Sequence, residues 1–81
     1  MAHEWHVYMV ECADGTLYSG VTTDVERRIK EHNDSPKGAK YTRAKRPVKL
    51  VYTEQYLNRS EATKREYALK QLSREEKLKL I

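Results

Sequence analysis

Two short runs of aromatic and β-branched side chains near the start of the chain constrain the fold most. They cover residues 5–11 and 16–20, and Ala13-Asp14-Gly15 separates them. Runs of this length favour β-strands, and a polar loop that contains glycine favours a tight turn between them. The sequence therefore predicts a β-hairpin at the start of the chain.

A helix is predicted directly after this hairpin. Asp24 is the expected N-cap, and the helix runs to about Asn33 with Val25 and Ile29 as its apolar contact. The polar segment 33–38, which contains a proline and a glycine, ends it.

A third strand is predicted at residues 47–56, where apolar and polar side chains alternate. Pro47 suits the first position of a strand because it has no backbone N–H to donate. The alternation places three large side chains on one face of the sheet, namely Val48, Leu50 and Tyr52.

Two helices are predicted after the third strand. Ser60 is the expected N-cap of the first, which runs from residue 61 to about residue 72. Its inward stripe consists of Ala62, Leu69 and Leu72. Ser73 and Glu76 have the spacing of a capping box, which indicates that a short final helix begins there.

The length of 81 residues fits one domain, so residues 1–81 are expected to form a single folded unit. Hydrophobic residues make up 38% of the chain and charged residues 35%, which predicts a thin core. The predicted elements follow the order β-β-α-β-α-α. We therefore predict an α+β fold, with a small three-stranded, largely antiparallel sheet packed by helices.

Several classes of protein are excluded by simple counts. Cys12 is the only cysteine, so an internal disulfide cannot form, and the histidines are too scattered for a four-ligand zinc site. No run of roughly 18 apolar residues is present to span a bilayer, and residues 1–10 lack the pattern of a secretory leader. We expect a cytoplasmic protein with no membrane role.

The net charge of +4 is concentrated in the middle of the chain. Residues 34–50 hold six basic side chains and one acidic one, whereas residues 1–33 hold three basic and six acidic ones. Such a segment favours a phosphate backbone as its partner, because bound cations release condensed counterions. A solvated loop explains the segment equally well. The expected nucleic-acid contacts are Lys37, Lys40, Tyr41, Arg43, Lys45 and Arg46.

Three polar side chains fall on or beside the apolar faces of the predicted helices. Arg28 and His32 are four residues apart and lie beside the apolar contact of their helix. Glu66 lies inside the apolar stripe of its helix, where a carboxylate needs a partner. One explanation is structural: Arg28 and Glu66 form a buried ion pair, and His32 is a hydrogen-bonded residue at the edge of the core. The other explanation is a functional site.

Five segments follow one another in an order that carries more information than any of them alone. They are His6-Val7-Tyr8, Tyr18-Ser19-Gly20, Arg28 with His32, Gly38-Ala39-Lys40-Tyr41-Thr42, and Arg65-Glu66-Tyr67. Their order and spacing resemble the GIY-YIG nuclease domain over nearly the whole chain. The later segments are similar to the branch that holds structure-specific nuclease subunits and small stand-alone bacterial proteins. His6, Val7 and Ser19 depart from the letters of the family name, but both tyrosines and the glycine are present.

This resemblance implies a role for each matching residue. Family members hydrolyse a phosphodiester with one divalent cation, which implies Mg²⁺ or Mn²⁺. Tyr8 becomes the expected general base and Tyr18 its hydrogen-bonding neighbour, Arg28 the phosphate clamp, and His32 an auxiliary acid, base or positioning group. Glu66 becomes the metal ligand, and one carboxylate is enough because Mg²⁺ keeps several waters.

The resemblance also implies DNA as the substrate, in repair or maintenance. No added DNA-binding module is visible, so the chain has low intrinsic specificity, recognises shape, or is directed by a protein partner. Two other functions fit the sequence. One is a nucleic-acid-binding module of the same fold that does not cleave, and the other is a small basic accessory protein in which Arg28 and Glu66 only pair.

A shared site leads to two geometric expectations. A three-residue loop at 13–15 pairs Val10 with Tyr18 and places Tyr8 and Tyr18 on one sheet face, whereas a two-residue loop separates them. Arg28 and Glu66 should converge across the site, with room for one metal ion and one phosphate between them.

Overall fold

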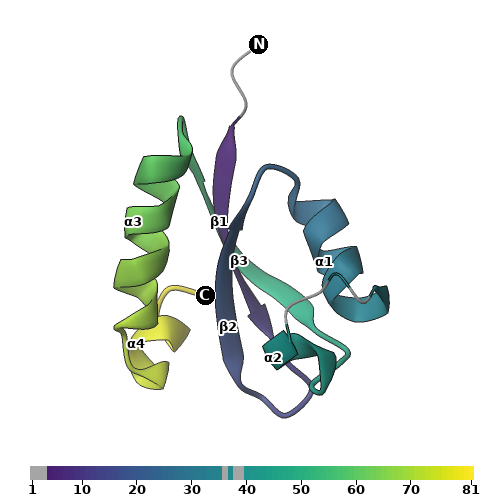
Figure 1. Cartoon of the computed structure of the whole chain (residues 1–81). Helices are drawn as coiled ribbons and strands as arrows, with labels where there is room; N and C mark the ends of the chain where they lie inside the picture. The colour runs from purple at the N-terminus through teal and green to yellow at the C-terminus, as the bar shows by residue number, and fades with distance from the viewer. Residues whose placement is uncertain (1–3, 36, 38–39) are drawn as a thin grey trace.

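A computed structural model of the chain describes residues 4–35, 37 and 40–81. Three strands form an antiparallel sheet in the order β2-β1-β3, and helices lie against both of its faces (Figure 1). The elements in chain order are β1 (Trp5–Glu11), β2 (Leu17–Thr22), α1 (Val25–Asp34), α2 (Lys40–Arg43), β3 (Lys49–Tyr56), α3 (Arg59–Lys70) and α4 (Arg74–Leu78). The predicted α+β fold and the predicted order of its elements are confirmed. The short helix α2 is an addition that the sequence pattern did not predict.

The hairpin between β1 and β2 has the predicted three-residue loop. Val10 pairs with Tyr18, and the backbone N–H of Cys12 donates to the carbonyl of Thr16 over 2.8 Å. Gly15 closes the turn with φ = 85°, in the left-handed region that favours glycine. The register places the side chains of Tyr8, Val10 and Tyr18 on one face of the sheet, as expected for a shared site.

A bulge in β3 overturns the predicted alternation of that strand. Val10 pairs with Leu50 while the preceding residue, Met9, pairs with Tyr52, so Val51 is an extra residue in β3. An extra residue reverses which side chains face which side. Tyr52 therefore packs with Met9 and not on the Leu50 side, and the prediction that Val48, Leu50 and Tyr52 share a face is wrong for Tyr52.

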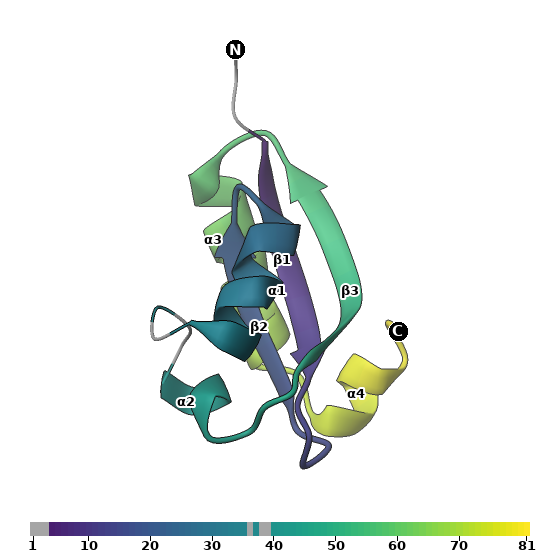
Figure 2. The same ribbon diagram turned by 90° about the vertical axis from the view of Figure 1, so that its right-hand side faces the viewer.

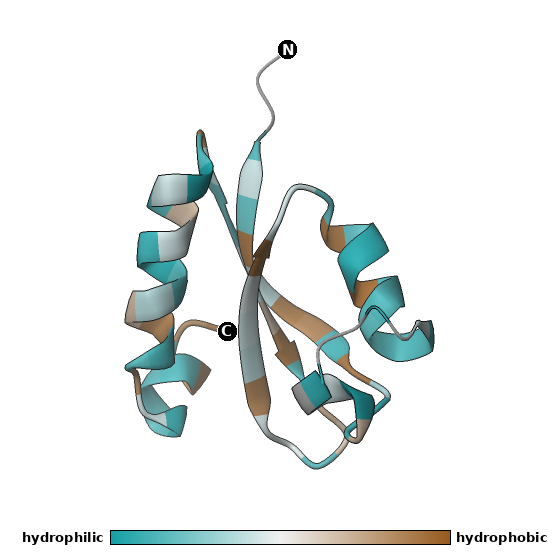
Figure 3. Ribbon diagram, viewed as in Figure 1, coloured by the Kyte–Doolittle hydropathy of each residue, from teal (hydrophilic) through white to brown (hydrophobic). Residues whose placement is uncertain are grey.

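The sheet separates two hydrophobic clusters. The cluster under α3 contains Val7, Met9, Ala62 and Leu69, all fully buried, and Leu72 packs against it. The cluster under α1 contains Tyr8, Val10, Cys12 and Val48, with Tyr18 and Ile29 at its edge. Figures 2 and 3 show α1 and α3 on opposite sides of the sheet, with hydrophobic residues along the strands between them.

Helix ends follow local capping chemistry. Asp24 caps α1 by accepting from the backbone N–H of Arg27, and Ser73 and Glu76 form the predicted capping box of α4. The predicted cap Ser60 is wrong, because α3 begins at Arg59, two residues before the predicted start, and Asn58 caps it by accepting from Glu61 N over 2.9 Å. In the described part of the chain, no helix has the length and apolar character needed to cross a membrane.

Candidate active site

Tyr8 lies at the centre of β1 and is 1% exposed. It pairs with Gly20 of β2, and a Cβ added to Gly20 would lie 2.6 Å from Cζ of the Tyr8 ring. Real Cβ atoms essentially never approach a neighbour this closely, so any larger residue at position 20 would force the ring to move. The glycine of the Tyr18-Ser19-Gly20 segment is thus explained by the tyrosine that covers it.

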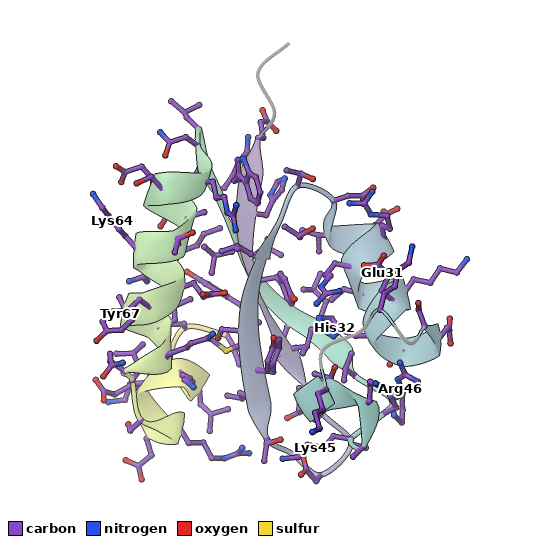
Figure 4. The ribbon with its side chains drawn as sticks, viewed as in Figure 1. Glu31, His32, Lys45, Arg46, Lys64 and Tyr67 are labelled. Carbon is purple, nitrogen blue, oxygen red and sulfur yellow. The ribbon has the colours of Figure 1, made fainter. Side chains whose placement is uncertain are left out.

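His32 connects this tyrosine to the next helix. The side chain is fully buried and lies between α1 and the sheet (Figure 4). Its Nε2 lies 2.7 Å from the Tyr8 hydroxyl, and its Nδ1 lies 2.8 Å from the hydroxyl of Thr42 in α2. The ring of Tyr18 meets the imidazole edge-on with 5.5 Å between centroids. The four side chains bring β1, β2, α1 and α2 together at one point.

Both members of the Tyr8–His32 pair are neutral at pH 7, and burial strengthens this preference. Burial lowers the pKa of His32 to about 4, and the nearby charges of Arg28 and Arg46 act in the same direction. Burial also raises the pKa of Tyr8 to about 12, although a hydrogen bond and the charge of Arg28 oppose it. Tyr8 therefore needs additional positive charge before it can act as a base.

Arg28 lies beside the Tyr8–His32 pair, and its side chain is 25% exposed. Its guanidinium donates to the carboxylate of Glu31 over 3.2 Å and to the backbone carbonyl of Lys37 over 2.9 Å. Burial lowers the pKa of Arg28, but contacts with Tyr8 and Glu31 outweigh this effect and raise it overall. The result is a fixed cation beside the Tyr8 hydroxyl.

Glu66 approaches from α3, on the opposite side of the sheet from α1. Its side chain is 19% exposed and lies 3.6 Å from Nζ of Lys70. The charge of Glu66 raises the pKa of Tyr8 while that of Arg28 lowers it, so both act on the same hydroxyl. Arg28 pairs with Glu31 and Glu66 pairs with Lys70, so the two do not form the direct ion pair that was the structural explanation.

The site contains few groups that could hold a metal. In residues 4–35, 37 and 40–81, no three His, Cys, Asp or Glu side chains gather as a ligand cluster. His32 uses both ring nitrogens in hydrogen bonds, and Glu31 is engaged by Arg28. Glu66 remains, and a single carboxylate fits the chemistry of Mg²⁺, which takes its other ligands from water and substrate phosphate.

The basic segment divides into exposed and engaged side chains. Lys37, Lys40 and Arg43 are exposed, and the last two belong to α2. Lys45 pairs with Asp14 over 3.1 Å. Arg46 donates to the backbone carbonyls of Glu31, His32 and Ser35 at the end of α1. The expected contact through the side chain of Tyr41 lies outside what the structure describes.

Two residues of the site were given no role by the sequence pattern. Thr42 holds Nδ1 of His32, and Gly20 makes room for Tyr8. Both lie in segments that carry the family resemblance, which is the signal by which they could have been found. Their partners are 10 and 12 positions away in the chain, so spacing along one helix or strand does not reveal them.

Comparison with known proteins identifies the family of the chain. The GIY-YIG catalytic domain matches residues 4–79. A UPF0213 protein of Desulfotalea psychrophila is 64% identical over 77 residues, which cover 95% of this chain and 70% of that protein. A UPF0213 protein of Halobacterium salinarum is 58% identical over 72 residues, covering 89% and 92%. The solution NMR structure of a UPF0213 protein from Bacillus halodurans is 51% identical, covers 95% of this chain and 81% of that one, and has a TM-score of 0.60. The chain belongs to the GIY-YIG family of nucleases.

Proposed function

We propose that the chain hydrolyses phosphodiester bonds in DNA with the help of one divalent cation, Mg²⁺ or Mn²⁺. One observation carries this proposal: the buried Tyr8 hydroxyl is hydrogen-bonded to His32 and lies in the fields of both Arg28 and Glu66. A general base, a cation for the phosphate and a carboxylate for a metal are the groups that such a reaction uses.

Arg28 is the proposed phosphate ligand. A phosphoryl transition state spreads negative charge over its equatorial oxygens, so a fixed cation stabilises it more than the ground state. Glu31 and the Lys37 carbonyl hold the guanidinium in place before substrate arrives. Preorganisation of this kind removes the cost of ordering a long side chain during the reaction.

Tyr8 and His32 are the proposed path for the proton of the attacking water. With Nδ1–H donating to Thr42, the Nε2 lone pair of His32 can accept from the Tyr8 hydroxyl. Tyr8 then takes a proton from water while its own proton moves to Nε2. An approaching phosphate raises the pKa of His32, which favours this transfer. A cation held by Glu66 would add positive charge beside the phosphate and make the attacking water more acidic.

Lys37, Lys40 and Arg43 are the proposed contacts to the DNA backbone, since their side chains are exposed. They carry no base-reading geometry of their own, so they would bind many sequences alike. We therefore propose that DNA shape or a protein partner directs the cut, in DNA repair or maintenance and in the cytoplasm.

A cleavage panel tests this function. Linear duplexes, single strands, flaps and branched DNA are incubated with the full chain in Mg²⁺, in Mn²⁺ and in EDTA. Cleavage in either metal and none in EDTA is the expected result, with Arg28→Ala inactive. Binding without cleavage under every condition would instead make the chain a non-cleaving module of the same fold.

A further inference from the structure

A second cationic surface lies at the N-terminal end of β2, away from Tyr8 and on the α4 side of the sheet. Arg74 and Lys77, one helical turn apart, line a hollow of about 180 Å³ together with Thr16 and Leu17. Figure 1 places α4 and α2 on opposite sides of the lower part of β2, and Figure 2 agrees. Neither the catalytic proposal nor the basic segment around α2 uses these two cations.

Arg74 is held in position by the hairpin. One of its terminal nitrogens donates to the carbonyl oxygen of Gly15, so the guanidinium sits beside the loop with its other N–H groups available. Within the described residues, neither Arg74 nor Lys77 forms an ion pair, unlike Lys45 on the other side of the loop, which pairs with Asp14. Two cations that form no ion pair among the described residues, beside an open hollow, attract an anion, against the opposing charges of Glu75 and Glu76 on the same helix.

The hairpin connects this surface with the proposed active site. Thr16, in the hollow, directly precedes β2, and Gly20, opposite Tyr8, is four residues further along the extended backbone, which corresponds to about 13 Å. One strand of duplex DNA advances 3.4 Å per phosphate along its axis, so about 13 Å corresponds to about four phosphates. A DNA strand that passes over the edge strand β2 beside Gly20 would therefore meet the hollow about four phosphates further along.

We propose that Arg74 and Lys77 form a second phosphate-binding site, which holds the DNA strand about four nucleotides from the bond that is cut. The position of the site relative to the cut rests on the proposed function; the contact with a phosphate backbone does not. DNA then contacts the protein on both sides of β2, at α2 and at α4.

Fluorescence anisotropy with a labelled DNA duplex of about 20 base pairs, roughly two turns, tests the site. All proteins carry Glu66→Gln so that the DNA stays intact. Arg74→Gln with Lys77→Gln is compared with Lys30→Gln and Lys64→Gln, which removes the same charge from the exposed outer sides of α1 and α3. We expect the slope of log K for DNA binding against log salt to become shallower by about 0.9 for each lost phosphate contact. This change should occur in the Arg74→Gln, Lys77→Gln variant and not in the Lys30→Gln, Lys64→Gln variant.

Equal slopes in the two double variants would overturn the site. Lys77→Gln alone repeats the test without disturbing the Arg74 bond to Gly15, and thermal unfolding confirms that each protein is folded. If the parent chain cleaves DNA, the cut is mapped, and duplexes that end two or eight base pairs beyond it are compared. Relative to the parent, the Arg74→Gln, Lys77→Gln variant should bind the duplex that extends eight base pairs beyond the cut more weakly, and the duplex that extends two base pairs equally well. A parent that does not cleave, combined with a lower slope, would contradict the proposed function and leave the phosphate site standing.

Discussion

Tyr8 and Gly20 face each other across β1 and β2, and the tyrosine ring covers the α-carbon of the glycine. Gly20 is needed because a side chain there would collide with the Tyr8 ring. Its backbone conformation is not the reason, since the glycine with positive φ in the described chain is Gly15. This close approach lets the hydroxyl pass over an edge strand and reach His32 2.7 Å away. The pairing of Tyr8 with a glycine at position 20 is therefore a packing requirement.

Gly20→Ala should displace the Tyr8 ring. Overpacking of this kind costs about 1–3 kcal/mol of unfolding free energy, and the bond to His32 should lengthen or break. Urea unfolding gives the first effect, and the NMR shift of the His32 ring nitrogens gives the second. Ser19→Ala is the control, because its buried hydroxyl has no hydrogen-bond partner among the described residues and its loss should leave stability unchanged or slightly higher. Similar effects from both substitutions would contradict the packing account.

His32 should make the fold sensitive to mild acid. Its pKa is about 4 in the folded chain, where Tyr8, Arg28, Glu31 and Arg46 surround it, and about 6.5 when unfolded. Between these values the unfolded chain binds a proton that the folded chain does not, so stability falls as the pH drops through this window. The loss is about 3 kcal/mol. Urea unfolding at a series of pH values measures it, and His32→Gln should flatten the profile while His6→Gln keeps it.

Glu54 should stabilise the contact between β3 and α3. It accepts from Arg65 over 2.8 Å and from the hydroxyls of Tyr52 and Tyr56. Burial raises the pKa of Glu54, but Arg65 and the two tyrosines outweigh it and lower the pKa to about 2. Glu54→Gln removes the negative charge that pairs with Arg65 and should cost about 1–3 kcal/mol by urea unfolding. The control Glu61→Gln, at an exposed position, should lower the free energy of unfolding by at most about a few tenths of a kcal/mol. An equal loss in Glu54→Gln and Glu61→Gln would show that the contacts of Glu54 add nothing to stability.

Arg46 should act on the fold and not on DNA. Its guanidinium closes the last turn of α1 through three backbone carbonyls, one of them that of His32. Arg46→Ala should lower the thermal midpoint, and Arg46→Lys should not restore it, because an ammonium lacks the planar fork. Lys40→Gln with Arg43→Gln should do the reverse, with an unchanged midpoint and a smaller salt slope of DNA binding. A reduced salt slope of DNA binding in folded Arg46→Ala would return this residue to the nucleic-acid surface.

Local signals predicted much of this fold because they act over a few residues. The Ala13-Asp14-Gly15 loop set the register of β1 with β2, and Asp24 and Ser73 mark where helices begin. The bulge at Val51 was not predictable, since it depends on how β3 meets β1 and leaves no mark on the alternation. The helix α2 was missed because four residues carry no apolar stripe.

The candidate site was predictable only in part for a similar reason. Placing Arg28 and His32 on one side of a helix needed only helical spacing. The complete burial of His32 depends on partners from β1 and α2, which become neighbours through the fold. Helical spacing also could not show that Glu66 pairs with Lys70 and leaves Arg28 to Glu31.

The most direct test of the account measures cleavage and thermal unfolding of Glu66→Gln beside the parent chain in Mg²⁺ or Mn²⁺. Within the residues that the structure describes, the carboxylate pairs only with the half-exposed Lys70, an interaction worth about 0.5 kcal/mol or less, so the melt should barely change. Lys70→Gln breaks the same pair and keeps the carboxylate. We predict that the parent and Lys70→Gln cleave DNA, whereas Glu66→Gln folds normally and does not. Cleavage by Glu66→Gln at the parental rate, or a collapsed melt of Glu66→Gln with no activity in the parent, would contradict the account.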